Sequence, residues 1–265
     1  MKRSLEKEMM DLPDQPEELL KEDLRNLRII NRYLGGYRGV LRCIAQISRE
    51  QKINGFSLLD VGTGSGDIPI RIVDWAQRRG IKAGIVALEP ERVTARIAAR
   101  LIQQANPPFM LLSQRLPSNV IPAQAGIQGR EGDFQRCGIS VVRGDAMSPP
   151  FPSSSFDFVL ASQLLHHFSE EQIIAVLQGW TAIARKAIIV SDLIRHPVAY
   201  CGIRLITRLF TQNIMTITDA PLSVKRAFTR AEWRDLFRRA SIGPFRISSV
   251  FPYRMVTTFF LADSR

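Results

Sequence analysis

The stretch LLDVGTGSGD at residues 58–67 constrains the fold of this chain more than any other feature. The apolar residues at its start predict a strand, and the amphipathic pattern over residues 67–79 predicts a helix after it. Between them, Gly62, Gly64 and Gly66 allow a turn with positive φ angles or a close approach to a ligand. A strand, glycine-rich turn and helix in this order are typical of sites for nucleotide-like cofactors.

The residues around this turn distinguish among the cofactors that it could hold. No lysine follows Gly66, so the pattern differs from the phosphate-binding loop of ATP and GTP proteins. Asp67 occupies the expected helix start, where a dinucleotide would place its pyrophosphate, and a carboxylate there would repel that group. Asp60 before the turn and Asp67 after it instead favour a cation. S-adenosylmethionine carries a sulfonium and an ammonium group but no phosphate, so we expect it to be the cofactor.

Further acidic residues follow where this cofactor requires them. Residues 84–89 predict a second strand that ends in Glu89, about 20 residues beyond the turn, where a carboxylate can accept hydrogen bonds from ribose hydroxyls. A third strand is expected to end at Gly144, Asp145 and Ala146. Asp145 is then placed to accept a hydrogen bond from an adenine amino group.

In this order and spacing, the segments DVGTGSGD, Glu89, GDAMSPPFPSSSFDFV and QLLHHF resemble the motifs of one family over residues 55–195. The family is that of class I S-adenosylmethionine-dependent methyltransferases, of the small-molecule type related to ubiquinone and menaquinone biosynthesis methyltransferases. The resemblance implies an α/β fold: a Rossmann-like, seven-stranded, mostly parallel sheet with helices on both faces. It also implies these cofactor-binding residues: Asp60, Gly62, Thr63, Gly64, Gly66, Asp67, Glu89, Pro90, Gly144, Asp145, Ala146 and Ser162.

The expected organisation is a helical cap followed by a methyltransferase core. Residues 1–54 form the cap, because residues 16–47 have apolar positions at helical spacing, interrupted at Gly35 and Gly36. The core covers residues 55–265 and includes a helical substrate cap over 196–228, inserted after the fifth strand. Ser169 with Gln172 and Thr229 with Glu232 have the spacing of capping boxes, and an antiparallel strand pair is expected to close the sheet at the C-terminal end.

Residues 106–138 do not fit the alternation of strands and helices. They form a link of about 30 residues where about 2 to 6 would be usual. The peptide IPAQAGI within it can be encoded by ATTCCCGCGCAGGCGGGAATC, whose arms ATTCCCGC and GCGGGAAT are reverse complements, and it resembles translated bacterial inverted repeats. We therefore expect a repeat element inserted into a loop, which costs little entropy. A functional substrate lid is the alternative.

The candidate catalytic residues follow the fourth and fifth strands. His166 and His167 lie just after the fourth strand, at the sheet edge where doubly wound folds bind ligands, and a histidine suits general base catalysis. Their alternative role is packing beside the cofactor. Asp192 and Arg195 are expected at the same edge and could orient a phenol or a carboxylate. A purely structural ion pair is the alternative for these two.

The net charge of +11 is concentrated in the C-terminal third. Residues 185–254 hold thirteen Lys and Arg against four acidic residues. Residues 197–210 are amphipathic, with Arg204 and Arg208 one turn apart, so this segment could cover an apolar substrate or contact an anionic membrane. No recognised RNA-binding appendage accompanies the basic residues, so nucleic acid is not expected as a partner.

The sequence therefore predicts a cytoplasmic S-adenosylmethionine-dependent methyltransferase. Its acceptor is expected to be the oxygen or carbon of a small, aromatic or lipid-like metabolite. The alternatives are an RNA or protein methyltransferase that uses the basic third, and an inactive cofactor-binding protein. The three cysteines are widely separated, so no metal site is expected, and neither a secretory signal nor a spanning segment is visible.

Overall fold

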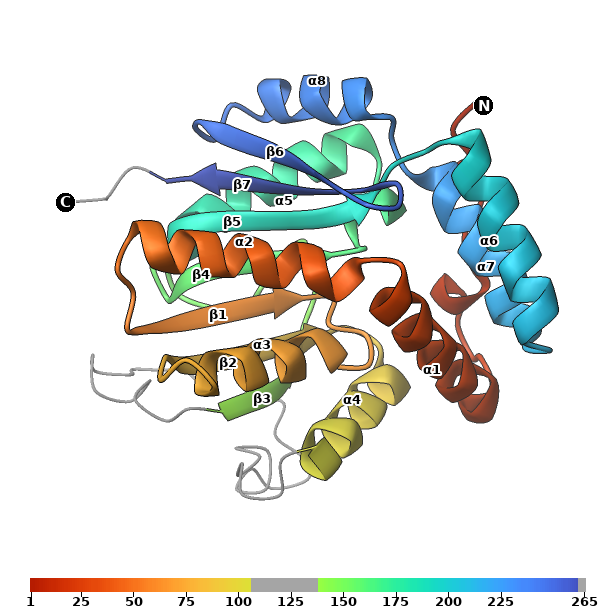
Figure 1. Ribbon diagram of the computed structural model, residues 1–265, viewed down its shortest axis with the longest axis horizontal. Helices are drawn as coiled ribbons and strands as arrows, with labels where there is room; N and C mark the ends of the chain where they lie inside the picture. The colour runs from red at the N-terminus through yellow and green to blue at the C-terminus, as the bar shows by residue number, and fades with distance from the viewer. Residues whose placement is uncertain (106–137, 262–265) are drawn as a thin grey trace.

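The computed structural model describes residues 1–105 and 138–261 and contains one seven-stranded sheet in the order β3-β2-β1-β4-β5-β7-β6 (Figure 1). Strands β1 to β5 are parallel, whereas β7 is antiparallel to both β5 and β6. The predicted sheet and its antiparallel C-terminal pair are confirmed. The strands are β1 (Gly55–Val61), β2 (Lys82–Glu89), β3 (Gly138–Arg143), β4 (Phe156–Ser162), β5 (Ala184–Leu193), β6 (Phe245–Val250) and β7 (Arg254–Phe260).

Helices cover both faces of the sheet, as expected for strands that are buried on both sides. Helices α2 and α3 contribute to the apolar core on one face, and α5 and α8 to the core on the other. The α-helices are α1 (Glu17–Tyr33), α2 (Gly36–Glu50), α3 (Asp67–Gln77), α4 (Arg92–Ala105), α5 (Glu170–Ile183), α6 (Pro197–Phe210), α7 (Ile214–Arg226) and α8 (Arg230–Ala240). Two short 3-10 helices, η1 (Met9–Asp11) and η4 (Leu165–His167), complete the set in the described ranges.

The N-terminal region differs from the predicted cap. The expected break at Gly35 and Gly36 separates α1 from α2, and Gly35 has a φ of 81°. Helix α2 lies on the sheet, because its stripe of Val40, Ile44 and Ile47 is buried in one apolar core with residues of α3 and the strands. Within the N-terminal region, α1 and the residues before it lie beyond the carboxyl ends of the parallel strands, whereas α2 does not (Figure 1).

Helices α6 and α7 form the predicted insertion after β5 and pack against each other at the same end of the sheet as α1 (Figure 1). Both predicted capping boxes are present. Ser169 with Gln172 begins α5, and Thr229 with Glu232 begins α8. The carboxyl ends of the parallel strands therefore face a layer made of α1, α6 and α7.

The proposed insertion at residues 106–138 lies outside the described residues, apart from Gly138, which begins β3. Among the described residues, no helix is both long enough and apolar enough to span a membrane.

Candidate functional site

The glycine-rich turn follows β1 directly and approaches other elements too closely for larger residues. Gly62 and Gly66 have φ angles of 67° and 74°. A Cβ at Gly62 would lie 2.8 Å from Leu164, and one at Gly66 would lie 2.9 Å from Ile102. Glycine satisfies both constraints because it tolerates positive φ and has no Cβ.

Three carboxylates, those of Asp60, Asp67 and Glu89, lie around this turn. Asp60 Oδ2 accepts a hydrogen bond from Thr63 Oγ1 at 2.6 Å, and Glu89 Oε2 accepts one from Gly64 N at 3.0 Å. Burial raises the pKa of Asp60 to about 7, against the opposing hydrogen bond from Thr63 and with smaller contributions from the carboxylates of Asp67 and Glu89. Burial also raises the pKa of Glu89 to about 7, against the opposing effect of its backbone hydrogen bonds. In the described part of the chain none of the three carboxylates forms a salt bridge.

A cavity of about 110 Å³ is lined by Asp60 and Asp67 and overlaps the predicted cofactor site. Asp67 Oδ2 and Ser162 Oγ are buried there without a hydrogen-bond partner in the described residues. A ligand with cationic and hydrogen-bonding groups would satisfy these atoms. The expected cofactor residues in the lining are Asp60, Gly62, Thr63, Gly64, Asp67 and Ser162.

The residues expected around the adenine lie at the ends of β2 and β3 and are not part of this cavity lining. Gly144 N donates to Glu89 O at 3.3 Å, which holds the two strand ends together. Pro90 and Asp145 are exposed, and Asp145 Oδ1 accepts from Met147 N at 2.9 Å. Ala146 is buried and its carbonyl accepts from the indole of Trp180, so the strand end is fixed.

His166 lines the cavity and forms a buried pair with Asp192. His166 Nδ1 lies 2.7 Å from Asp192 Oδ1, and both side chains are at most 2% exposed. Asp192 Oδ1 also accepts from Leu193 N, which fixes the carboxylate at the end of β5. A carboxylate at Nδ1 places the proton on that nitrogen, so a neutral His166 has its lone pair on Nε2. This Nε2 atom is buried and has no hydrogen-bond partner in the described chain.

The N-terminal segment reaches this pair, which nothing in its sequence pattern predicts. Backbone N–H groups of Met9 and Met10 donate to the carboxylate of Asp219 on α7 at 2.9 and 3.0 Å. Glu8 is thereby placed with Oε1 at 3.7 Å from His166 Nε2. Burial raises the pKa of Glu8 to about 7, although His167 lowers it.

His167 lies beside His166 but has a different environment. Its Nδ1 is 2.9 Å from Asp11 Oδ2, and its Nε2 is 3.8 Å from Glu8 Oε1. Glu8, His166 and His167 offer three metal-ligand atoms within 4.8 Å of one another. The guanidinium of Arg226 lies 3.8 Å from the same Glu8 oxygen and supplies a positive charge there. This positive charge disfavours a metal cation at the cluster.

Arg195 is not at the cavity, contrary to its predicted catalytic role. Its guanidinium pairs with Glu232 on α8, with N–O distances of 2.5 and 2.6 Å. Asp192 and Arg195 are three positions apart, and side chains at odd separations in extended chain point to opposite sides. Asp192 faces His166, whereas Arg195 fixes the end of β5 to α8.

A second cavity, of about 240 Å³, adjoins the first. The two share Leu27, Gln163, Ala220 and Ser223 as lining residues. Gln163 has a φ of 55°, an unusual value for a residue other than glycine and one that is common at functional sites. The polar residues of this region, Asn31, Gln163 and Arg254, come from separate segments and carry no sequence motif. Sequence analysis did not identify them.

The chain is similar to known methyltransferases in sequence and in structure. Residues 59–186 match the family described as "Methyltransferase domain". A putative S-adenosylmethionine-dependent methyltransferase from Methanococcus maripaludis is similar in structure, with 14% identity, a TM-score of 0.56, and coverage of 96% of this chain and 99% of that one. A putative O-methyltransferase from Nostoc punctiforme has 17% identity and a TM-score of 0.56, with 98% of this chain and 64% of that chain covered.

Human N-acetylserotonin methyltransferase, solved with S-adenosylmethionine, has 14% identity and a TM-score of 0.54, with 93% of this chain and 57% of that chain covered. At these identities the structural matches show the fold. No curated protein matches the sequence.

The domain match and the shared fold together indicate a methyltransferase. Residues 59–186 are its methyltransferase domain, and the cofactor is S-adenosylmethionine. The chain is therefore an S-adenosylmethionine-dependent methyltransferase.

Proposed function

We propose that this enzyme methylates an oxygen atom of a small apolar metabolite in the cytoplasm, with His166 as the general base. The observation that carries the proposal is the free Nε2 of His166, which is buried at the cofactor cavity and held by Asp192 on its other nitrogen. Cys43 and Cys201 are free thiols, which fits the reducing cytoplasm.

The chemistry needs a positioned acceptor and a place for its proton. Asp60, Asp67 and Ser162 would hold the cofactor, which would supply a methyl group on a sulfonium that is already activated for displacement. The acceptor oxygen would take this methyl group as the S–C bond breaks with its electron pair remaining on sulfur. The hydroxyl proton passes to His166 Nε2, and Asp192 stabilises the resulting imidazolium. Glu8, when ionised, adds a second negative charge beside it.

An apolar second cavity beside the cofactor site supports a small aromatic or lipid-like acceptor. Helices α1, α6 and α7 cover this cavity, and an RNA strand or folded protein would have to displace them to reach His166. The same arrangement favours the small-molecule reaction over RNA or protein methylation.

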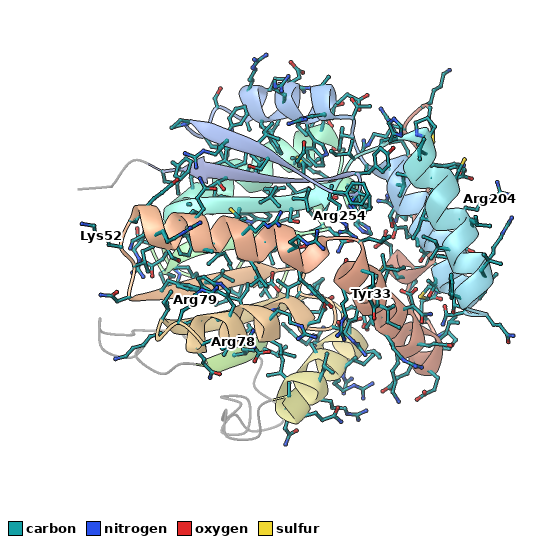
Figure 2. All side chains as sticks on the ribbon, in the orientation of Figure 1. Tyr33, Lys52, Arg78, Arg79, Arg204 and Arg254 are labelled. Carbon is teal, nitrogen blue, oxygen red and sulfur yellow. The ribbon has the colours of Figure 1, made fainter. Side chains whose placement is uncertain are left out.

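The outer side of α6 supports a contact with an anionic membrane surface. Leu205, Leu209 and Phe210 are 61%, 68% and 81% exposed, and Arg204 and Arg208 are exposed among them. Figure 2 shows Arg204 extending away from the body of the protein. Exposed apolar side chains interspersed with arginines suit the boundary between acyl chains and anionic headgroups. An acceptor delivered from such a surface would enter beside α6.

The class of acceptor is tested by following a labelled methyl group. Protein is incubated with methyl-labelled cofactor and a cell extract, and label is measured in organic-soluble, RNA and protein fractions. We expect label in the organic fraction, bound to oxygen in the isolated product. Label confined to RNA or protein, or on carbon, would contradict the proposal, and the absence of transfer would favour an inactive cofactor-binding protein.

The base is tested by His166→Asn with His196→Asn as its control. His196 caps α6 outside both cavities, and Asn is also a good capping residue. We expect the His166 variant to lose about 100-fold or more in kcat with unchanged cofactor affinity, the range for a lost general base. The His196 variant should retain activity. Equal activity of the two variants would exclude His166 as the base.

A further inference from the structure

The second cavity is apolar except at one end. Its walls come from α1, α6, α7 and the segment that leads into β7, and they include Ile30, Leu34, Leu193, Ile203, Ile206 and Val224. Walls of this kind favour an apolar ring or chain. Gln163 lines both this cavity and the cofactor cavity.

Arg254 is the one cationic side chain among the described lining residues of this cavity. It begins β7, and Figure 2 shows it between the sheet and the layer of α6 and α7. The residue is 3% exposed. Burial lowers the pKa of Arg254 to about 10, which the nearby carboxylate of Asp192 opposes, so the guanidinium is charged at neutral pH.

The hydrogen bonds of Arg254 are incomplete. Nη2 donates to Asn31 Oδ1 at 3.1 Å, and this same oxygen also accepts from Gln163 Nε2 at 2.6 Å. Nη1 is buried without a partner among the described residues. Asp192 does not pair with it, since its oxygens accept from His166 and from Leu193 N. A buried charge with an unpaired donor is costly unless something else binds it.

We infer that the second cavity binds the acceptor and that Arg254 pairs with an acidic oxygen, such as a carboxylate, on its apolar body. A guanidinium presents donors in a planar fork that matches a carboxylate. This inference rests on the proposed function, because it takes the second cavity as the acceptor site of the same reaction. Leu193 pairs in register with Arg254, next to the Asp192 that holds His166, so the anchor and the base lie at the same sheet edge.

The test uses 3-hydroxy-2-naphthoate and its methyl ester as probes, with binding measured by calorimetry in the presence of S-adenosylhomocysteine. The acid and the ester share the ring and the hydroxyl and differ in the charge. We expect wild-type protein to bind the acid at least about tenfold more tightly. Arg254→Met should remove this preference by weakening the acid and leaving the ester unchanged.

The location of the probe is tested by Gly202→Phe with Gly179→Phe as the matched control. Both glycines are helical, and an added Cβ at either would have no heavy atom within 4 Å. Gly202 lines the second cavity, whereas Gly179 is exposed on α5. We expect the Gly202 variant to lose binding of both probes at least tenfold, and the Gly179 variant to bind like wild type.

Equal wild-type affinity for acid and ester, absence of binding by both, or unchanged binding by the Gly202 variant would each overturn the inference. If the Arg254 variant does not fold, the inference is still tested by the ratio of the wild-type affinities for acid and ester and by the two glycine variants. Calorimetry needs no turnover, so a clear preference for the acid without methyl transfer to oxygen would refute the proposed function and leave this inference standing.

Discussion

Binding of S-adenosylmethionine should release protons from Asp60 and Glu89 below pH 7. Burial raises the pKa of each carboxyl to about 7 in the free protein. Raising the pKa of Glu89 from 4.5 to about 7 corresponds to about 3 kcal/mol, since a tenfold change is about 1.4 kcal/mol. A cation in the site offsets part of this cost and lowers both pKa values.

At pH 6 a carboxyl with a pKa of 7 is about 90% protonated, so we expect between one and two protons released per cofactor bound. The dissociation constant should fall by about tenfold or more from pH 5.5 to 7. In this range the cofactor's own ammonium group keeps its proton, because α-amino groups titrate near pH 8. Calorimetry in two buffers of different ionisation enthalpy counts the protons directly.

Asp60→Asn should release about one proton fewer, while Glu18→Gln, an exposed change on α1, should behave like wild type. The protein without cofactor gives a second test, because its stability should fall with rising pH whereas its cofactor affinity should rise. Between about pH 4.5 and 7 the folded state holds more protons at these carboxyls than the unfolded chain, so the free energy of unfolding should fall as the pH rises. Binding heats that do not depend on the buffer, together with a dissociation constant that is constant from pH 5.5 to 7, would refute the reasoning.

Two further changes test the surroundings of the site. Arg195→Met should leave cofactor affinity unchanged and lower the unfolding temperature, because the guanidinium fixes β5 to Glu232 on α8; a loss of affinity in a folded variant would return Arg195 to the site. Wild-type protein should sediment with anionic vesicles at low salt, and Arg204→Glu with Arg208→Glu should abolish this with unchanged cofactor affinity. Equal sedimentation of wild type and the double variant would contradict the proposed membrane contact.

Local sequence determines most of what could be predicted for this chain. The glycine turn requires residues that tolerate positive φ at Gly62 and Gly66, and the capping box at Ser169 depends on a side chain three positions away. Such features lie within a few neighbouring residues, so their spacing in the sequence is enough to identify them. The order of the strands followed from the resemblance to a known family.

The residues of the proposed acceptor side could not be predicted in this way. Asn31 and Arg254 lie far apart in the sequence and are hydrogen-bonded only in the folded chain, and Glu8 reaches His166 from the N-terminal segment. In the sequence, each of these polar residues looks like an ordinary surface residue, and none belongs to a recognisable motif. Arg195 shows the reverse case, since it is close to Asp192 in the sequence but faces α8.

The N-terminal segment reaches the site through its contacts with α7. Backbone N–H groups of Met9 and Met10 donate to the carboxylate of Asp219, and Glu8 then lies 3.7 Å from His166. The packing of α7 at the sheet edge therefore decides where the Glu8 carboxylate lies. Met9 and Asp219 are 210 positions apart, so no local spacing in the sequence could have indicated that a residue of this segment lines the cavity.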